Sequence, residues 1–232
     1  MIPSFFRAPK STRFYGSIDE ARHFHRAADE FVRSFPAGAR LLDIGSGYRR
    51  WRPGVVNMDL AAYPETDVVA DAHRLPFEDA SFDGAILQGS LAYFADPKAA
   101  AGEVERVLKP GGRVYADENF FYPDDPTDAQ LNLSQKWRFT PAGFAKLFGR
   151  FEKEAAGAAM GPASALALAL RWNAALFLSR PWPGAFRPLW HLAGWCVWPL
   201  KYLDPLLEGH HPIVTLLLQL IGNLSFQCRL YR

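Results

Sequence analysis

Two glycines that follow a short apolar run are the clearest candidates for a ligand-binding turn. The run extends from Ala39 to Ile44, and Gly45 and Gly47 follow it with Ser46 between them. Glycine lets a ligand come close to the backbone and permits backbone angles that other residues rarely adopt. In an open α/β sheet, ligands bind at the carboxyl ends of the strands, where this turn would lie. Taken alone, the segment is also open to a purely structural turn.

Two acidic residues stand at the ends of the next apolar runs. Asp59 ends the predicted strand 55–59, and Asp71 follows the predicted strand 67–70. A carboxylate at the first position can accept hydrogen bonds from both hydroxyls of a ribose. A carboxylate at the second can accept one from an adenine amino group. The alternatives are a strand-end aspartate that caps a turn and an ordinary polar loop.

The elements that would position these residues alternate between strands and helices. Such alternation with short loops predicts a parallel sheet with helices on its faces. Proline at the first helical position after Asp96 and after Thr140 marks two helix starts. The predicted strands are 39–44, 55–59, 67–70, 82–87, 113–117, 151–156 and 225–231, and the predicted helices of this part are 17–35, 97–108 and 140–148, with a turn at 109–112.

The composition changes after Met160. Five of the seven tryptophans fall between Trp172 and Trp198, and helices are predicted over 164–178 and 212–222. We therefore predict a core of residues 1–160, a helical insertion of residues 161–223, and a last core strand within residues 224–232. The insertion is open to three interpretations: a helical subdomain or homodimer face, a lid over an acceptor, or a membrane-surface element with interfacial tryptophans.

Bulk properties exclude several classes of protein. A formal net charge of +2 with scattered basic residues argues against nucleic acid as a partner. Two cysteines provide neither a disulfide framework nor a zinc-binding spacing, and the histidines are placed poorly for a shared metal. No apolar segment of a signal peptide follows the N-terminus. We therefore expect no metal and a cytoplasmic location, with peripheral contact to the inner membrane as an alternative.

Five segments occur in an order that makes a family resemblance specific. They are Leu42-Asp-Ile-Gly-Ser-Gly47, Asn57-Met-Asp59, Ala70-Asp-Ala-His-Arg-Leu-Pro-Phe77, Ser81-Phe-Asp83 and Glu103-Val-Glu-Arg-Val-Leu-Lys-Pro-Gly-Gly112. Between Arg40 and Asp117 the chain resembles class I S-adenosylmethionine-dependent methyltransferases, most closely the bacterial small-molecule type. The resemblance implies a Rossmann-like, doubly wound, mostly parallel seven-stranded sheet with an antiparallel last strand. A helical insertion near the C-terminus would be added to it.

The resemblance also implies S-adenosyl-L-methionine as cofactor and four segments that hold it. The first turn would hold the methionine part, the second strand end the ribose, and the third strand end the adenine. The end of the fourth strand would face the methionine moiety and the acceptor. In that order, the implied residues are Asp43, Gly45, Ser46 and Gly47; Asp59 and Leu60; Asp71 and Ala72; and Gln88.

Methyl transfer from a sulfonium is an in-line displacement, and the protein mainly orients the acceptor and excludes water. A general base is needed only where the acceptor must lose a proton. Weak candidates near strand ends are His73, Tyr93 and Asp117, and a structural role is the favoured interpretation of each. The predicted function is methyl transfer to a small-molecule acceptor, such as a sugar, a lipid-linked precursor or a natural product. A non-catalytic binding or scaffold protein with the same fold is the alternative.

Two departures from related patterns matter. Arg50 occupies the third small-residue position of the dinucleotide fingerprint, which argues against NAD. Only ten residues, 45–54, separate the first two strands. A crossover that includes a helix usually needs at least ~10–12 residues. We therefore expect the first helix to be very short or replaced by a loop, and this shortening keeps the scaffold alternative open.

Overall fold

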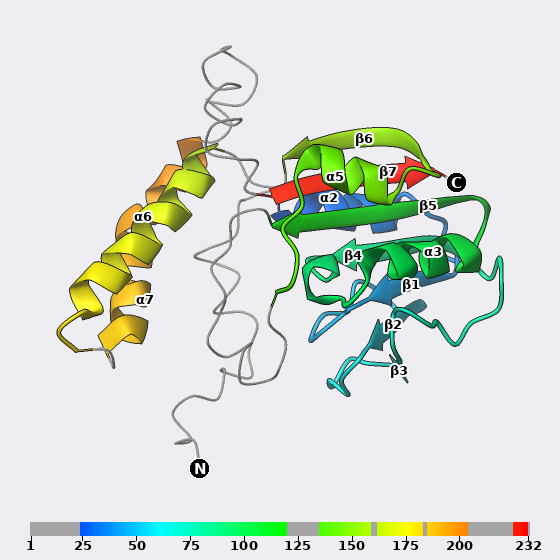
Figure 1. The fold of residues 1–232 in the computed structure, drawn as a ribbon, viewed down its shortest axis with the longest axis horizontal. Coiled ribbons are helices and arrows are strands. Elements are labelled where there is room, and N and C mark those ends of the chain that lie inside the picture. The colour runs from blue at the N-terminus through cyan, green and yellow to red at the C-terminus, as the bar shows by residue number, and fades with distance from the viewer. Residues whose placement is uncertain (1–23, 120–134, 159–161, 183–184, 204–224, 232) are drawn as a thin grey trace. The chain divides into compact units, whose positions relative to one another are not determined.

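The computed structural model describes residues 24–119, 135–158, 162–182, 185–203 and 225–231 (Figure 1). The chain divides into two compact units, with boundaries near residues 24, 160 and 222. Residues 25–159 and 223–232 belong to the sheet unit, and residues 160–222 belong to the helical unit. Each unit is described by itself below.

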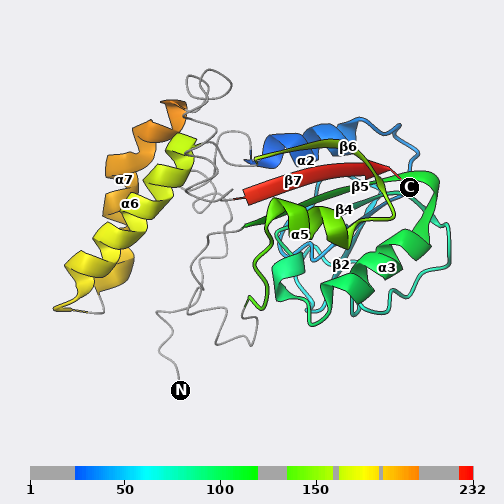
Figure 2. The same cartoon turned by 45° about the horizontal axis from the view of Figure 1, so that its top comes forward.

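A seven-stranded sheet with the order β3-β2-β1-β4-β5-β7-β6 forms the centre of the sheet unit. The first five strands in this order are parallel, and β7 runs antiparallel to both β5 and β6. Figure 2 shows β7 between its two neighbours. The Rossmann-like α/β class predicted from the sequence is confirmed. The strands are β1 Leu41–Ile44, β2 Val55–Asp59, β3 Val68–Val69, β4 Phe82–Gln88, β5 Leu108–Asn119, β6 Glu152–Ala158 and β7 Ser225–Tyr231.

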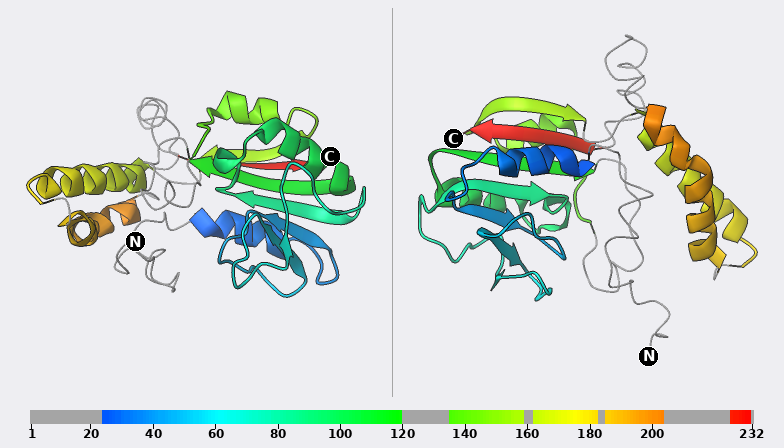
Figure 3. Two further views of the ribbon diagram at one scale, coloured as in Figure 1. Left: turned by 60° about the horizontal axis from the view of Figure 1, so that its bottom comes forward. Right: turned by 180° about the vertical axis from the view of Figure 1, so that it is seen from behind.

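Helices cover both faces of the sheet because neighbouring strand residues point to opposite sides. Leu41 packs against α2 (Phe24–Arg33), in a cluster with Phe31 and Tyr115. Leu42 packs in a second cluster with residues of α3 (Pro97–Val107) and α5 (Pro141–Leu147). Figure 3 shows α2 on one side of the sheet and α3 with α5 on the other. The hydrophobic core of this unit is therefore split into two layers by the sheet.

Local capping explains where two of the helices begin. The Asp96 carboxylate accepts hydrogen bonds from the backbone N–H of Lys98 and Ala99, at 3.0 and 3.1 Å. The Thr140 hydroxyl accepts one from Gly143 N–H at 3.1 Å. Side-chain acceptors at this position satisfy N–H groups that the first helical turn leaves without partners. The predicted helix starts after Asp96 and Thr140 are confirmed.

Several boundaries differ from those predicted, including the following three. Helix α2 begins at Phe24 within the described residues, and positions 17–23 of the predicted helix lie outside them. The prediction that a turn at 109–112 precedes the fifth strand is wrong, because β5 already begins at Leu108 and includes these residues. Leu108 pairs with Phe82 and Arg113 with Gly84, so the extra residues between them bulge from the strand. The predicted strand 67–70 is reduced to Val68–Val69.

The helical unit contains α6 (Pro162–Ser179), α7 (Phe186–Val197) and the 3₁₀ helix η4 (Trp198–Leu203). Helices α6 and α7 pack against each other, and both contact η4. The predicted helix over 164–178 is confirmed with an additional residue or two at each end, whereas the predicted helix over 212–222 lies outside the described residues. Within the described part of the chain, no helix has the length and apolar character needed to cross a membrane.

Candidate functional site

A cavity of about 390 Å³ opens at the carboxyl ends of β1, β2 and β4. The strand order changes direction between β1 and β4, and crevices at such switch points are where open α/β sheets bind ligands. The volume lies within the ~300–1,000 Å³ range of small-molecule sites. Among the predicted cofactor residues, Gly45, Gly47, Asp59, Leu60, Asp71 and Ala72 line it.

The turn after β1 is fixed by its backbone and by a close neighbour. Gly45 and Gly47 have φ angles of +76° and +56°, in the left-handed region that favours glycine. A Cβ atom added at Gly45 would lie 2.5 Å from Cβ of Ser90. The Ser90 hydroxyl in turn donates to the carbonyl of Ile44 at 2.9 Å. Glycine at position 45 therefore allows the chain after β4 to approach the end of β1.

Asp59 is oriented by the same turn. Its Oδ2 accepts a hydrogen bond from Gly47 N–H at 2.9 Å, and its Oδ1 accepts one from Ala61 N–H at 3.1 Å. Each carboxylate oxygen keeps a further lone pair for a ligand hydroxyl. The carboxylate is partly exposed and borders the cavity.

Asp71 and His73 form a linked pair on the cavity wall. Asp71 Oδ1 accepts from His73 N–H at 2.9 Å and is also hydrogen-bonded to His73 Nδ1. These bonds hold the pKa of Asp71 below its usual range. His73 Nε2 accepts from the backbone N–H of Asp96 at 3.0 Å, which places the ring proton on Nδ1. Both ring nitrogens of His73 are therefore engaged, which leaves it without a free lone pair for proton abstraction.

Asp43 lies behind the cavity instead of lining it. Its side chain is fully buried, and its Oδ2 accepts from the Trp51 indole N–H at 2.9 Å. Burial raises the pKa of Asp43 to about 6, although nearby Arg49 and the Trp51 hydrogen bond act in the opposite direction. Within the described residues, Asp43 Oδ1 has no hydrogen-bond partner. Ser46 is likewise buried and lies outside the cavity lining.

Gln88 and Asp117 extend this buried group across β4 and β5. Gln88 Nε2 donates to Asp117 Oδ2 at 2.9 Å, and the Tyr115 hydroxyl donates to the same oxygen at 2.8 Å. Arg49 donates a hydrogen bond to the side-chain oxygen of Gln88. The positive charge of the same guanidinium lowers the pKa values of both Asp43 and Asp117. Burial raises the pKa of Asp117 to about 6, opposed by the Gln88 and Tyr115 hydrogen bonds. We call Asp43, Arg49, Gln88 and Asp117 the buried charge cluster.

The buried charge cluster predicts an unusual dependence of stability on pH. Asp43 and Asp117 bind protons more tightly when folded, with pKa values of about 6 against an ordinary value of 3.8. Between about pH 4 and pH 6 the folded state thus carries more protons, and the free energy of unfolding falls as pH rises. We expect the free energy of unfolding of Asp117→Asn to fall less over this pH range than that of the wild type, by on the order of 2 kcal/mol. Urea denaturation across the window measures it, and equal slopes for both proteins would contradict the expectation.

The short segment between β1 and β2 contains no helix, as expected. Arg50 fixes it through two acidic residues: its guanidinium donates to Glu65 at 2.9 Å and to Asp67 at 2.8 Å. It also donates to the carbonyl of Val55 at 3.3 Å. These hydrogen bonds hold the loop in place without a helix between β1 and β2, and the structure still has a cavity at the ends of these strands.

Several cavity residues were missed by sequence reasoning. Ser90 and Phe94 follow β4, and the Gly89-Ser90 pair at a strand end is the signal that was available for them. Lys136 reaches the cavity from a distant part of the chain and donates to the Tyr93 carbonyl at 2.8 Å. Tyr93 also borders the cavity, and its hydroxyl accepts from Gln135 at 3.0 Å. Of the three weak candidates for a base, His73 and Tyr93 line the cavity, whereas Asp117 is buried and is not part of the lining.

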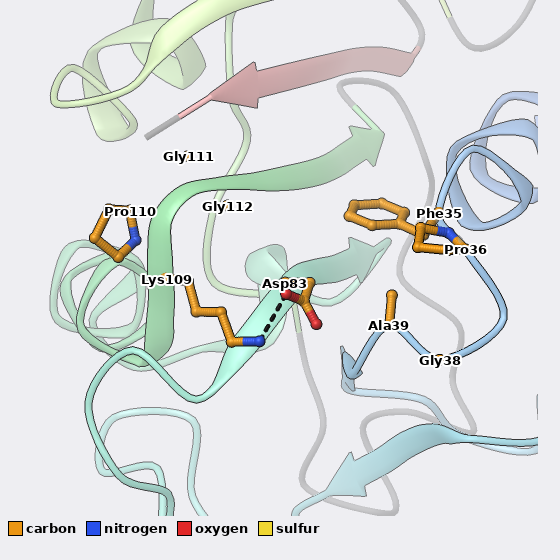
Figure 4. Close-up of a pocket in the computed structure, with 9 residues that line it drawn as sticks. All are labelled: Phe35, Pro36, Gly38, Ala39, Asp83, Lys109, Pro110, Gly111 and Gly112. Carbon is orange, nitrogen blue, oxygen red and sulfur yellow. Dashed lines mark hydrogen bonds and ion pairs between the residues drawn. The ribbon is translucent and has the colours of Figure 1, made fainter.

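A second cavity, of about 470 Å³, lies at the opposite edge of the sheet, beside the starts of β1, β4 and β5. Figure 4 shows Lys109 and Asp83 joined across it, at 2.7 Å. Asp83 also accepts from Arg40 N–H at 2.8 Å, and these bonds hold its pKa below the usual range. The two charged side chains of this cavity, Lys109 and Asp83, therefore form an ion pair with each other. Within the described residues, no group of histidine, cysteine and acidic side chains is arranged to hold a metal.

Comparisons with known proteins agree with this geometry. A family model described as a methyltransferase domain matches residues 52–116. The demethylmenaquinone methyltransferase of Renibacterium salmoninarum is 32% identical over 124 residues, which are 46% of this chain and 52% of that protein. The O-methyltransferase cnsE of Penicillium expansum is 45% identical over 64 residues, 26% of this chain and 23% of that protein. The chain spans about half, or less, of the length of these curated relatives.

A solved structure extends the likeness to the fold. The S-adenosylmethionine-dependent methyltransferase from Mesorhizobium loti matches with a TM-score of 0.53 and 17% identity, over 90% of this chain and 98% of that chain. At this low sequence identity, the match is evidence for the fold alone. The family model thus shows a methyltransferase domain over residues 52–116, and the strand order of the sheet agrees with it.

Proposed function

We propose that this protein transfers a methyl group from S-adenosyl-L-methionine to a small-molecule acceptor. The observation that carries the proposal is the arrangement of Asp59 and the Gly45–Gly47 turn around one cavity at the switch point. The acidic residue that ends β2 is anchored by the turn that ends β1, and both face the same space. A turn with only a structural role would need neither the cavity nor the anchored carboxylate.

The residues present fit the cofactor. At Gly45 a Cβ atom would collide with Ser90, so the glycine keeps the backbone open where a ligand must approach closely. Asp59 would hold the ribose hydroxyls, and Asp71 with Ala72 would border the adenine. Gly89, with a φ of +66°, lies at the end of β4 and would leave room for the methionine part. The buried charge cluster would support this end of the site from behind.

Catalysis would then rest mainly on placement. When bound, the cofactor supplies an activated methyl group on a sulfonium, which is a good leaving group. The chain's own residues exclude water and orient the acceptor, and such orientation is a large source of rate enhancement. Phe94 and Leu60 line the cavity with apolar side chains, and Tyr93, which also lines it, would orient an acceptor hydroxyl through its own hydroxyl.

The relatives narrow the proposed acceptor. One is named as a demethylmenaquinone methyltransferase, and its name therefore points to a quinone-type acceptor; the other is named as an O-methyltransferase. We therefore favour a small acceptor of the quinone type over a sugar, a lipid-linked precursor or another natural product, which the sequence leaves open. The apolar residues at the cavity are compatible with a ring of this kind.

Calorimetric titration with S-adenosylhomocysteine tests the proposal. We expect binding in the micromolar range and none for NAD. Asp59→Ala should weaken binding at least ~10-fold, because hydrogen bonds to a charged acceptor contribute about 1.5–3 kcal/mol. Asp79→Ala is the matched control: Asp79 is a highly exposed carboxylate that pairs with Arg106 outside the cavity, and its loss should leave binding unchanged.

Two outcomes would overturn the proposal. Undetectable binding to the folded wild-type protein would favour the non-catalytic scaffold. Equal affinities for wild type and Asp59→Ala would show that the ligand occupies some other site. Thermal unfolding of each variant verifies that the comparison is made between folded proteins.

A further inference from the structure

Tyr63 lines the cavity from the loop that joins β2 to β3, residues 60–67. Asp59 precedes this loop and Asp71 follows β3, and both carboxylates also line the cavity. In the sheet, β1 separates β2 and β3 from β4, whose end is marked by Gly89. Tyr63 therefore belongs to the side of the cavity that holds the two acidic strand ends.

The ring of Tyr63 contacts a second tyrosine from the neighbouring loop. Tyr48 lies in the loop between β1 and β2, and its ring centroid is 4.6 Å from that of Tyr63, at an interplanar angle of 58°. Aromatic rings at this separation attract each other. Tyr48 is 56% exposed and is not among the residues that line the cavity. Tyr48 therefore supports the ring of Tyr63 without bordering the cavity itself.

Hydrogen bonds hold both loops against β2. The side-chain amide of Asn57, a buried residue of β2, donates to the carbonyl of Arg49 at 2.6 Å and to that of Glu65 at 3.0 Å. Tyr63 N–H donates to the Thr66 hydroxyl oxygen at 3.1 Å, and Thr66 N–H donates to the Tyr63 carbonyl at 3.1 Å. Neither loop contains a helix. These bonds preorganise the backbone of Tyr63, which lowers the conformational cost of binding a ligand at its ring.

We propose that Tyr63 packs its ring against the nucleoside part of the cofactor and that Tyr48 positions this ring. The inference rests on the proposed function, in which Asp59 holds the ribose and Asp71 borders the adenine. Every nucleobase has an aromatic face, and its stacking on an aromatic side chain is favourable. The two carboxylates accept hydrogen bonds from the polar groups of a nucleoside, and Tyr63 supplies an aromatic surface on the same side of the cavity. Tyr63 is then a binding residue, and Tyr48, which acts through it, is a positioning residue.

The acceptor is the other ligand that could meet this ring. An acceptor must approach the transferred methyl group, and the proposed function places the methionine part of the cofactor beside Gly89 at the end of β4. Tyr63 comes from the opposite side of β1, next to the strand ends assigned to the ribose and the adenine. This placement favours the nucleoside over the acceptor.

Calorimetric titrations with S-adenosylhomocysteine and with methylthioadenosine test the inference, because the second ligand keeps the nucleoside and lacks the amino-acid part. Tyr63→Ala should weaken the binding of both ligands by about tenfold, which is the effect of losing one contact between a base and an aromatic ring. Tyr63→Phe keeps the ring and should bind both ligands within about twofold of the wild type. Tyr48→Ala should weaken binding about threefold on its own and no further in the Tyr63→Ala background, because it acts through that ring.

Val69→Ala is the matched control. Val69 lies in the adjacent strand β3, is 59% exposed and does not line the cavity, so its truncation should leave both affinities unchanged. Thermal unfolding verifies that each variant is folded. Absence of S-adenosylhomocysteine binding to the wild type would overturn the proposed function, and the inference with it.

Four other results would overturn the inference while leaving the proposed function intact, provided that the wild type binds S-adenosylhomocysteine. An unchanged affinity of Tyr63→Ala would show that the ring does not meet the ligand. A loss confined to S-adenosylhomocysteine, or a wild type that does not bind methylthioadenosine, would show that the ring does not serve the nucleoside. Equal losses for Tyr63→Phe and Tyr63→Ala would contradict a role for the ring. A further loss on adding Tyr48→Ala to Tyr63→Ala would refute the positioning role.

Discussion

Replacing Gly45 with alanine is expected to abolish S-adenosylhomocysteine binding and to lower the free energy of unfolding by about 3 kcal/mol. The added Cβ would lie 2.5 Å from Ser90 Cβ, so either the end of β1 or the segment after β4 must move. Overpacking of this kind costs about 1–3 kcal/mol, and the left-handed φ of +76° adds about 1–2 kcal/mol for a non-glycine residue. Urea denaturation and calorimetry measure the two effects.

Two further variants separate the collision from the backbone strain. Gly47 has a φ of +56° but nothing within 4 Å of an added Cβ, so Gly47→Ala should show the backbone cost alone, about 1–2 kcal/mol. Adding Ser90→Gly to Gly45→Ala removes the colliding atom and should restore part of the lost stability. Restoration will be incomplete, because the Ser90 hydroxyl bond to Ile44 is lost as well. Equal losses for Gly45→Ala and Gly47→Ala would refute the role of the close approach.

Replacing Arg49 with methionine is expected to cost about 3–5 kcal/mol of unfolding free energy at neutral pH. The substitution removes the guanidinium that lowers the pKa values of Asp43 and Asp117, and a buried charge without its partner is strongly destabilising. Methionine keeps an unbranched apolar stem of similar reach, so packing changes little. The loss should shrink at about pH 5, where both carboxyls, with pKa values of about 6 or higher, take up protons.

The neighbouring arginine provides the control. Arg50 pairs with Glu65 and Asp67, which are partly exposed, and such pairs usually contribute about 0–1 kcal/mol each. The pKa of Asp67 is lowered by Arg50, so this pair stays charged at about pH 5 and the effect of Arg50→Met should not diminish there. Denaturation of both variants at two pH values measures the contrast. A loss in Arg49→Met that is the same at both would disprove the electrostatic account.

The turn and the acidic strand ends of the site were predictable because they depend on local sequence. A glycine pair after an apolar run predicts a turn, and an aspartate at a strand end predicts a polar group at the sheet edge. Neither prediction depends on residues far away in the sequence. The caps at Asp96 and Thr140 are local in the same sense, and their helices were placed correctly. The start of β5 was not predicted correctly. The bulge after Leu108 depends on how β5 pairs with β4, which is a long-range property.

The position of Asp43 shows most clearly where sequence reasoning stops. Its motif associates it with the cofactor, but its carboxylate is turned to Trp51 and is buried near Arg49. Both partners come from the unusually short segment between β1 and β2, whose path no local pattern determines. Lys136 was missed for a similar reason, since it reaches the cavity from far along the chain.

The antiparallel pairing of β6 with β7 has a consequence for how this protein could have evolved. Ala158, the last residue of β6, pairs with Phe226 in β7, so the two ends of the intervening segment emerge side by side. Residues directly opposite in an antiparallel pair are only about 4.5–5.5 Å apart, a distance that a tight hairpin also bridges. A short hairpin could therefore replace the whole intervening segment while every strand of the sheet keeps its neighbours.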